Sequence, residues 1–475
     1  MKKIFHKNTI LVLVLALLSS CQNLFNDPLI KTNPNAVSAV DVPTLMSGTL
    51  LGLGQLHEDT DVRIAYMWSG QLTGESRQHL QYAQYQVTAS LFSFGNPYQV
   101  AGQARLLQTE ANAIKDARSK GIGRVIEALV IAKMACLYGD VPYAQAFDLN
   151  KYPTPVFDKQ LDVYAALQST LDSAIINLSA PTGIDLSAGD FIFGGNPQKW
   201  TAVANTLKAR LYLHLADYPN AIKYASLGVN SIANDALMPH GTSQLVDINL
   251  NYDFFYNVRP GDTGFNTPAF LPTFMQNRSN SKTNETALYS WFFLLTGTSL
   301  DGNPNGFFAP NAFQPIISYY ENQLILAEAY ARTSDLANAL IALNSVRGSL
   351  NTGYINGNTF PATGRQYDPY VIADFGVGGL ANPNAYPDTQ SALLYEIIAE
   401  KYIVTLSQYE SYNDVRRLAK ATPLIQLGIQ PIVTTPSGTI AERFIYPQTE
   451  INVNPNVPKV NGQVADQFQK LTIWQ

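Results

Sequence analysis

The stretch VIEALVIAKMACLYGDVPYAQAF, residues 125–147, carries the clearest helix end in the chain. Its apolar residues recur at helical spacing as far as Tyr138. Gly139 can take the left-handed conformation that closes a helix, and Pro142 cannot continue one. We therefore predict a long helix that stops at Tyr138 and turns into a loop. Cys136 lies in the apolar run, which predicts a buried packing role for its thiol.

Other amphipathic runs are expected to pair with this helix or with each other. One run through Leu106 and Ile114 precedes it, and Gly121 with Gly123 is predicted to separate the two helices. Small alanines beside large apolar residues are typical of tetratricopeptide-type repeats, although no strict period of about 34 residues is present. The predicted fold is mainly α, with tetratricopeptide-like helical pairs that form a curved scaffold. Further helices are expected at residues 161–178, 200–215, 220–229, 316–331, 336–343 (capped by Ser334) and 392–418.

Two long stretches between the helices are rich in Gly, Asn, Pro and Ser. Loops of this length inside a compact domain are uncommon and usually functional. They are expected to form an irregular subdomain that carries the binding surface. We predict one domain at residues 21–475, with a helical scaffold at 40–238 and 315–420, a loop-rich insert at 239–314, a second loop at 351–390 and a C-terminal tail at 421–475.

The N-terminus has the pattern of an exported protein. Basic residues in MKKIFHK precede the apolar run Ile10 to Leu18, which is too short to span a bilayer as a helix. The following LLSSCQN resembles a bacterial lipobox, so residues 1–20 are predicted to be a signal peptide and Cys21 to be acylated, with palmitate among its lipids. An ordinary signal with a coincidental cysteine is the alternative. If Cys21 is acylated, the polar segment that follows it is expected to be a tether to the lipid anchor.

Charge and composition narrow the function. The formal net charge is −5, only 14% of residues are charged and 11% are aromatic. An acidic chain of this kind is not a nucleic-acid binder. Flat amphipathic rings with few charges suit neutral polar ligands such as sugars, although core packing accounts for most aromatics in any protein.

Signatures of catalysis, cofactors or metals are absent from the sequence. It has no HExxH, Walker, GxSxG or strand-to-helix GxGxxG motif. His57-Glu58-Asp59 is interpreted as a solvated turn, and DGNPNG at 301–306 as a turn that only imitates a calcium loop. No catalytic residue, cofactor or metal site is therefore predicted. Paired carboxylates for glycoside hydrolysis stay an open alternative, because their spacing in the fold is not visible in sequence.

Aromatic residues at loops or helix ends are the remaining candidates for ligand contact. A sugar presents an apolar face that a ring can cover, and its hydroxyls need polar partners nearby. Ordinary packing is the competing explanation for each ring. The candidate ligand-binding residues are Trp68, Arg77, Tyr82, Tyr85, Trp291 and Phe292.

The chain resembles the SusD/RagB family, in its SusD-like subgroup. The motifs that carry the resemblance follow the family's order: a lipobox, NPN at 33–35, YGDVPYAQAF, SYYENQLILAEAYAR with NSVR after it, SYNDVRRL, and RFIYPQTEINVN at 443–454. The resemblance implies a lipid-anchored protein of the outer membrane, facing the cell exterior, that forms a lid on a TonB-dependent, SusC-like barrel transporter. It also implies that Gly139, Asp140 and Pro142 end a helix, and that Arg416, Arg417, Tyr446 and Glu450 hold the tail to the scaffold.

The function expected from these observations is capture of an oligosaccharide and its delivery to the transporter, without catalysis. No ligand-binding motif of the family transfers residue by residue, so the aromatic candidates depend on chemistry alone. Three alternatives stay open: a peptide-capturing protein of the same architecture, a surface glycosidase, and a helical-repeat scaffold without a small ligand. Acidic residues that often follow the cysteine in surface-exported relatives are missing at 22–25.

Overall fold

The structure, a computed structural model, describes residues 40–436 and 438–474. The predicted signal peptide, the acylation site Cys21 and the tether at 21–39 lie outside the described residues. Within the described residues, none of the helices combines the length and the apolar character needed to cross a membrane.

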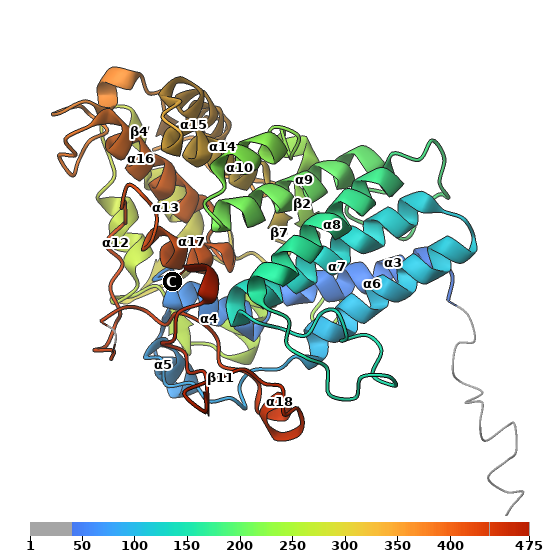
Figure 1. Ribbon diagram of the computed structural model, residues 1–475. Coiled ribbons are helices and arrows are strands. Elements are labelled where there is room, and N and C mark those ends of the chain that lie inside the picture. Colours follow the sequence, from blue (N-terminus) through green and yellow to red (C-terminus); the bar gives the residue numbers. More distant parts are fainter. Residues whose placement is uncertain (1–39, 437, 475) are drawn as a thin grey trace, which may run out of the picture.

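The scaffold is a row of helices in which neighbours along the chain contact one another. Figure 1 shows the row running from α3 and α6 at the right to α15 and α16 at the upper left. The prediction of a mainly α fold built from tetratricopeptide-like helical pairs is confirmed. The helices of the row are α3 (Val42–Leu56), α6 (Gly95–Ala113), α7 (Ala117–Tyr138), α8 (Gln160–Leu178), α9 (Pro197–His214), α10 (Tyr218–Ala225), α14 (Tyr319–Arg332), α15 (Leu336–Asn351) and α16 (Thr389–Val404).

Helix α7 is the centre of the row and ends as predicted. From Gly121 to Tyr138 nearly all of its residues are buried. Gly139 closes the helix with φ +86°, in the region that favours glycine. Cys136 is buried as expected, and burial raises the pKa of its thiol to about 12. The apolar run therefore forms the helix that its periodicity predicted, with a packed thiol.

The two glycines expected to separate α6 from α7 lie inside α7 instead. The turn falls before α7, where Asp116 caps the helix. A side chain at Gly121 would meet Leu178 at 2.8 Å, and one at Gly123 would meet Gln108 at 2.9 Å. These glycines let α8 and α6 approach α7 closely, which is a packing role rather than a loop role.

Two further expectations about helix ends were wrong. Ser334 does not cap α15; it has φ +66°, and the carboxylate of Asp335 accepts the bond from the Asn338 N–H. The last amphipathic run is not one helix, since it breaks after Val404 at a turn in which Ser407 has φ +64°. The second half is α17 (Glu410–Leu418), which contacts α4 (Thr60–Trp68).

The loop-rich segments contain short elements rather than bare loops. Strands are two to four residues long and pair antiparallel, two at a time. Gln366 of the second loop pairs with Asn284 of the insert, so the two segments are joined at this point. The insert also reaches back to the start of the domain, where Thr73 pairs with Gly264. Apart from α4, α17 and the tail, the described helical elements outside the row are α5 (Arg77–Ala83), α11 (Leu250–Tyr252), η2 (Asp253–Val258, a π-helix), α12 (Phe270–Gln276), α13 (Thr286–Phe292), η1 (Ile232–Asn234) and η3 (Ile372–Phe375).

The strand pairs have the following bounds. They are β1 (Thr73–Gly74) with β3 (Thr263–Gly264), β2 (Ala236–Met238) with β7 (Gln314–Ile317), β4 (Thr283–Asn284) with β10 (Gln366–Tyr367), β5 (Phe293–Thr296) with β6 (Ser299–Gly302), β8 (Tyr354–Ile355) with β9 (Asn358–Thr359), and β11 (Lys459–Val460) with β12 (Gln463–Val464).

The C-terminal tail, with α18 (Gln448–Val453) and η4 (Thr472–Trp474), returns to the scaffold. Arg416 donates to the backbone carbonyls of Glu442 at 2.8 Å and Cys136 at 2.9 Å, which joins α17, the tail and α7. Trp474 of η4 lies against α17, with the Arg416 guanidinium 4.5 Å from its ring. The role expected for Arg416 and for Tyr446 in holding the tail is confirmed.

The same expectation fails for the other two residues. The Arg417 side chain has no hydrogen bond to the described tail; it forms a bidentate pair with Glu328 of α14, with nitrogen–oxygen distances of 2.8 and 2.6 Å. Glu450 is half-buried on α18, and its backbone carbonyl accepts a bond from Asn454 within the tail itself. Burial raises the pKa of the Glu450 carboxyl.

Candidate functional site

Two of the predicted ligand-binding rings belong to the core. Trp68, at the end of α4, is 1% exposed, and its ring packs edge-on against Phe444 at 5.2 Å and Tyr412 at 5.8 Å. Tyr85 is 5% exposed and contacts Trp68 at 5.6 Å. Neither ring offers a face to a sugar in this structure, because the tail residue Phe444 and its neighbours cover it.

Trp68 instead positions a neighbouring candidate. Its indole Nε1 donates to the backbone carbonyl of Tyr82 at 2.9 Å, which fixes the end of α5. The Tyr82 ring is half-buried and stands edge-on to His79 at 5.3 Å. Part of the Tyr82 ring is therefore accessible to a ligand. The hydrogen bond from the buried Trp68 holds the Tyr82 backbone in place.

The start of α5 is held by one buried carboxylate from the insert. The side chain of Asp262 is fully buried and accepts from Ser76, Arg77 and His79. Burial opposes ionisation of Asp262, but these three donors lower the pKa of its carboxyl below the usual value. The Arg77 side chain is 54% exposed despite this bond. The bond to Asp262 thus fixes the position of the Arg77 side chain while part of it stays exposed to solvent. Arg77 lies on α5, more than one helical turn before Tyr82.

The second predicted aromatic group lies where α13 runs into β5. Phe292 is fully buried against Phe307 at 4.9 Å, so it is a core residue. Trp291 is half-buried, and its indole Nε1 has no hydrogen-bond partner among the described residues. The next residues of β5, Leu294 and Leu295, are 41% and 65% exposed. Trp291 is therefore the accessible ring of this group.

Both groups lie against the insert, one on α5 and one on α13, but the structure does not join them into one site. Phe265 follows β3, which pairs with β1 just before α5, and its ring lies 4.8 Å from Phe293. The α5 residues and Trp291 are thus connected through the aromatic core of the insert. No ring contact joins Tyr82 to Trp291 within the described chain.

Sequence reasoning missed a further aromatic pair on the insert. Tyr252 and Tyr256 are half-buried on α11 and η2, with ring centroids 5.0 Å apart. The Tyr256 hydroxyl donates to the backbone carbonyl of Gly302, which ties η2 to β6. The run YDFFYN at 252–257 was the available signal, but its aromatic density alone did not separate these rings from packing residues.

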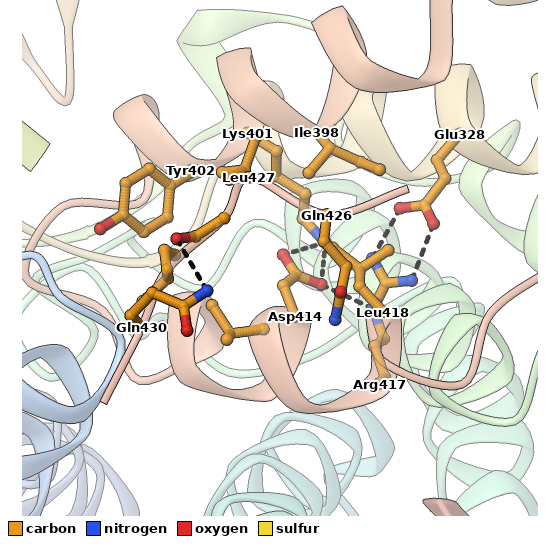
Figure 2. A pocket seen from close by; sticks show the side chains of 13 residues that line it. Glu328, Ile398, Lys401, Tyr402, Asp414, Arg417, Leu418, Gln426, Leu427 and Gln430 are labelled. Atoms are coloured by element: carbon orange, nitrogen blue, oxygen red, sulfur yellow. Dashed lines mark hydrogen bonds and ion pairs between the residues drawn. The ribbon is translucent and has the colours of Figure 1, made fainter. Parts of the chain in front are cut away.

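A pocket of ≈ 60 Å³ lies between α16, α17 and the segment 426–430 (Figure 2). Its charged side chains are already paired: Lys401 with Asp414 at 3.0 Å, and Arg417 with Asp414 at 2.7 Å and with Glu328 at 2.6 Å. Figure 2 shows these side chains pointing toward one another across the pocket. The space suits a few water molecules, so the pocket is a seam of the scaffold rather than a sugar site.

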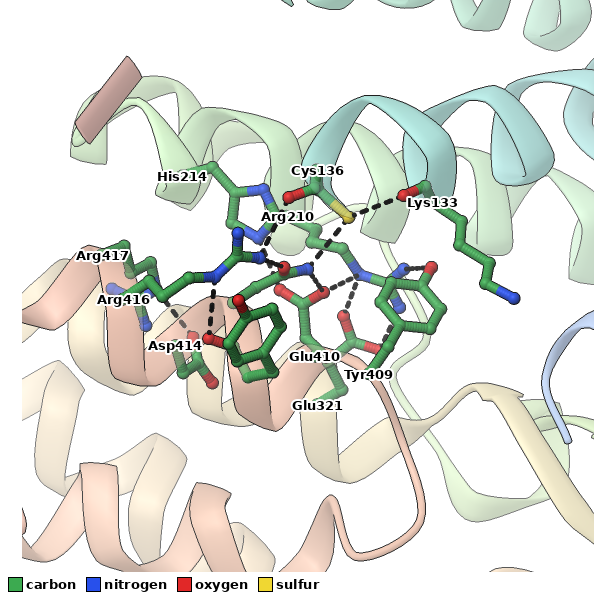
Figure 3. A network of polar contacts seen from close by, with 12 residues as sticks. Lys133, Cys136, Arg210, His214, Glu321, Tyr409, Glu410, Asp414, Arg416 and Arg417 are labelled. Carbon is green, nitrogen blue, oxygen red and sulfur yellow. Dashed lines mark hydrogen bonds and ion pairs between the residues drawn. The ribbon is translucent and has the colours of Figure 1, made fainter. Parts of the chain in front are cut away.

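A pair of buried carboxylates between the scaffold helices is also structural. Figure 3 shows Arg210 of α9 between Glu321 of α14 and Glu410 of α17. Arg210 binds Glu321 through two bonds of 2.5 and 2.7 Å, and His214 contacts Glu410 at 2.5 Å. All four side chains are at most 3% exposed. These two carboxylates cannot reach a polysaccharide, because the scaffold helices close over them.

Two sequence motifs have defined places. His57-Glu58-Asp59 forms the corner between α3 and α4, but His57 and Glu58 are 4% and 1% exposed, so the expectation of a solvated turn was wrong. The stretch 301–306 completes β6 and then turns, with the Asn303 side chain accepting from the Asn305 N–H at 3.0 Å. That turn is the one predicted for DGNPNG.

Comparison with known proteins relates the chain to one family and one fold. Residues 34–250 match the family SusD-like_2, described as starch-binding and associating with the outer membrane. No curated protein matches the sequence. The fold is similar to that of a SusD/RagB family protein from Bacteroides thetaiotaomicron VPI-5482, with 21% identity, TM-score 0.62, and coverage of 88% of this chain and 95% of the other.

Two further solved structures share the fold over almost the whole chain. A SusD homologue from Bacteroides fragilis NCTC 9343 has 18% identity and TM-score 0.66, with 92% of this chain and 100% of the other covered. A chitin-binding protein has 20% identity and TM-score 0.63, with 91% and 99% covered. These neighbours span nearly their full length, so the row of helices and the insert form one recurring architecture.

Proposed function

Because the chain is a SusD-like protein, by sequence over residues 34–250 and by fold over the described residues, we propose that it captures a neutral oligosaccharide at the outer membrane. The observation that carries this proposal is the match to a starch-binding family. The chitin-binding protein of the same fold adds a second glycan to the class of cargo that this architecture serves. Which glycan this chain prefers depends on its own loops.

The insert and the neighbouring helix α5 supply residues suited to such a ligand. Tyr82 and Trp291 are half-buried rings, and the structure holds each on a rigid element. Arg77, fixed by Asp262 and largely exposed, can donate to sugar hydroxyls. We propose these three of the six sequence candidates as ligand contacts. Trp68, Tyr85 and Phe292 are assigned to packing because of their burial.

The proposal includes transport and no catalysis. A lipid on Cys21 would anchor the chain to the outer membrane, facing outward, and a TonB-dependent SusC-like barrel would receive the glycan. Binding without hydrolysis is supported by the location of the carboxyls with pKa raised to about 7, namely Asp61, Asp235 and Glu400. Each of these residues is under 9% exposed. A polysaccharide therefore cannot reach these carboxyl groups to take a proton from them.

The experiment is a calorimetric titration of the full chain with neutral hexasaccharides of the α1,4-glucan, β1,4-glucan and N-acetylglucosamine series. Tyr82→Ala and Trp291→Ala should each weaken binding by about 1–3 kcal/mol if the ring stacks on a sugar. Tyr330→Ala is the matched control, since Tyr330 is equally half-buried but lies on α14.

The outcomes separate ligand contact from folding. A folded Tyr82→Ala or Trp291→Ala variant with wild-type affinity would remove that residue from the site. Absence of binding to every glycan series by the wild-type chain would argue against oligosaccharide capture. Binding of oligopeptides in its place would favour the peptide-capturing alternative.

A further inference from the structure

A second cleft, away from Tyr82 and Trp291, opens between α3, α6 and η2. Its volume is ≈ 520 Å³, within the range of ligand sites in proteins. The corner between α3 and α4 closes one end, and Phe254 with Val258 of η2 forms a wall. Figure 1 shows α3 and α6 side by side at the right of the row. None of the six sequence candidates lines this cleft.

The two helices present matching faces to the cleft. Positions 48, 51, 52 and 55 of α3 and positions 96, 99, 100 and 103 of α6 line it. Both sets have the spacing i, i+3, i+4, i+7, so each is one face of its helix. Gly48 leaves the α3 side open, since a side chain there would meet nothing within 4 Å, whereas a side chain at Gly52 would meet Val100 of α6 at 2.7 Å. The groove is therefore open at Gly48.

Four primary amides line the groove and have no protein partner. Their side chains make no hydrogen bond to any other described residue, and none of them is buried. A primary amide donates two hydrogen bonds and accepts two, so it matches a hydroxyl group in either direction. The four amides are Gln55 on α3 and Asn96, Gln99 and Gln103 on α6.

The closed end of the groove holds unsatisfied polar atoms. Glu58 lines the groove at 1% exposure, and its Oε1 has no hydrogen-bond partner. The guanidinium of Arg63 lies 4.2 Å above the Phe254 ring, and its Nε is also unpartnered. A buried polar atom without a partner costs free energy, so these two atoms point to a ligand or water that supplies bonds there.

The acidic side chains of the groove have polar partners within the protein. Asp59 pairs with Lys133 at 2.6 Å, and Glu58 lies 3.2 Å from the imidazole of His240. Asp253 accepts from the Asn257 amide at 2.8 Å. Asp253 has no cationic partner among the described residues, while the four amides supply uncharged donors and acceptors along the groove. The lining therefore suits a neutral, hydroxyl-rich chain.

We infer that this groove is a second oligosaccharide-binding site. The amides of α3 and α6 bind sugar hydroxyls, and Glu58 with Arg63 binds the sugar unit at the closed end of the groove. The inference rests on the proposed function and adds a site to it. Phe254 is the wall between the two sites: its ring lies 5.0 Å from His79, which in turn contacts Tyr82. A longer glycan that reaches both sites would be held at two points, and two weak sites on one chain raise its overall affinity.

The test fills the groove without disturbing the fold. Gly48→Leu places a side chain into the open groove, and Gly102→Leu is the matched control. Gly102 lies inside α6, a side chain there also meets nothing within 4 Å, and it does not line the groove. A second variant, Gln99→Ala with Gln103→Ala, removes two amides. The probes are maltohexaose, cellohexaose and chitohexaose, titrated into the full chain whose melting temperature has been checked.

The inference predicts that Gly48→Leu and the double amide variant each weaken hexasaccharide binding about tenfold, as loss of two hydrogen bonds would. Gly102→Leu should stay within about twofold of wild type. Unchanged binding in Gly48→Leu, alongside loss in Tyr82→Ala, would overturn the second site and leave the proposed function standing. Equal losses in Gly48→Leu and Gly102→Leu would also overturn it.

Two further outcomes concern the ligand class. If the wild-type chain binds none of the hexasaccharides, both the second site and the proposed function fail. If a neutral hexapeptide of Gly and Ser binds instead and Gly48→Leu abolishes that binding, the groove is a peptide site and the inference is wrong. Competition between glycan and peptide for the same groove is measured by repeating the glycan titration with the peptide present.

Discussion

The hydroxyl of Tyr446 donates a 2.9 Å hydrogen bond to the backbone carbonyl of Asp140, and this bond joins the C-terminal tail to the loop that follows α7. Both residues belong to the motifs that carried the family resemblance. Arg443 donates to the carbonyl of Tyr138 in the same place. The carbonyls at the end of a helix have no partner within it, so the tail supplies the donors that α7 lacks.

Tyr446→Phe should therefore lower the free energy of unfolding by about 1 kcal/mol, because the Asp140 carbonyl loses its donor while the ring stays in place. Tyr152→Phe is the control, since the Tyr152 hydroxyl has no hydrogen bond to any described residue. Denaturant unfolding of both variants measures the difference. Equal stability of the two would contradict a structural role for this bond.

Trp68→Ala should lower the free energy of unfolding by about 3–5 kcal/mol, the range for removal of a large buried ring. The Trp68 ring is 1% exposed and contacts Phe444 and Tyr412. Trp291→Ala should cost clearly less, because that ring is half-buried. Urea unfolding of the two variants in parallel decides the assignment: a larger loss for Trp291→Ala would reverse the roles given to the two rings.

Glu321→Gln should lower the free energy of unfolding by about 3–5 kcal/mol, since it leaves the buried Arg210 without its bidentate partner. Glu110→Gln on α6 is the control, because Glu110 forms no ion pair with a described residue. Chemical denaturation at pH 7 gives both values. A loss below about 1 kcal/mol for Glu321→Gln would mean that Arg210 finds a replacement partner.

Asp235→Asn should change how stability depends on pH. Burial raises the pKa of Asp235 to about 7, against bonds from Tyr354 and the Tyr319 N–H that favour its ionised form. The folded chain then takes up this proton near pH 7, and the unfolded chain only near its ordinary value of 3.8. Between these values the folded state binds more protons, so this group adds stability as pH falls from 7 toward 4.

The difference in unfolding free energy between wild type and Asp235→Asn should therefore shift in favour of wild type on acidification, by at most about 1.4 kcal/mol per pH unit. Denaturant unfolding of both proteins at pH 7.5 and pH 5 measures the shift. A difference that is the same at the two pH values would show that Asp235 does not take up a proton in this range.

The sequence predicted helices well and their junctions poorly. Apolar periodicity located α7, α8, α9 and α14, because each buries a continuous face. The predicted junctions were wrong where one residue type or pattern is compatible with two structures. Gly121 and Gly123 serve close helix packing instead of a turn, and the break at Ser407 falls inside an unbroken amphipathic pattern. Local spacing does not contain the tertiary contact that decides between these uses.

The candidate site shows the same limit. Six residues were proposed from aromatic chemistry, and burial separates Arg77, Tyr82 and Trp291 from the rest. Trp68 and Tyr85 are covered by Phe444 and Phe468, which lie almost 400 residues later in the chain. The groove between α3 and α6 was not predicted, because exposed amides on two helices give no signal until the helices are placed together.

The measurement that tests the central claim most directly is a gentle detergent extraction of the full-length tagged chain from its own outer membrane, followed by mass spectrometry of the co-purifying proteins. The account predicts a TonB-dependent barrel transporter in stoichiometric amount, together with a lipid on Cys21. A chain recovered alone, under conditions that keep other membrane complexes intact, would contradict its role in glycan uptake.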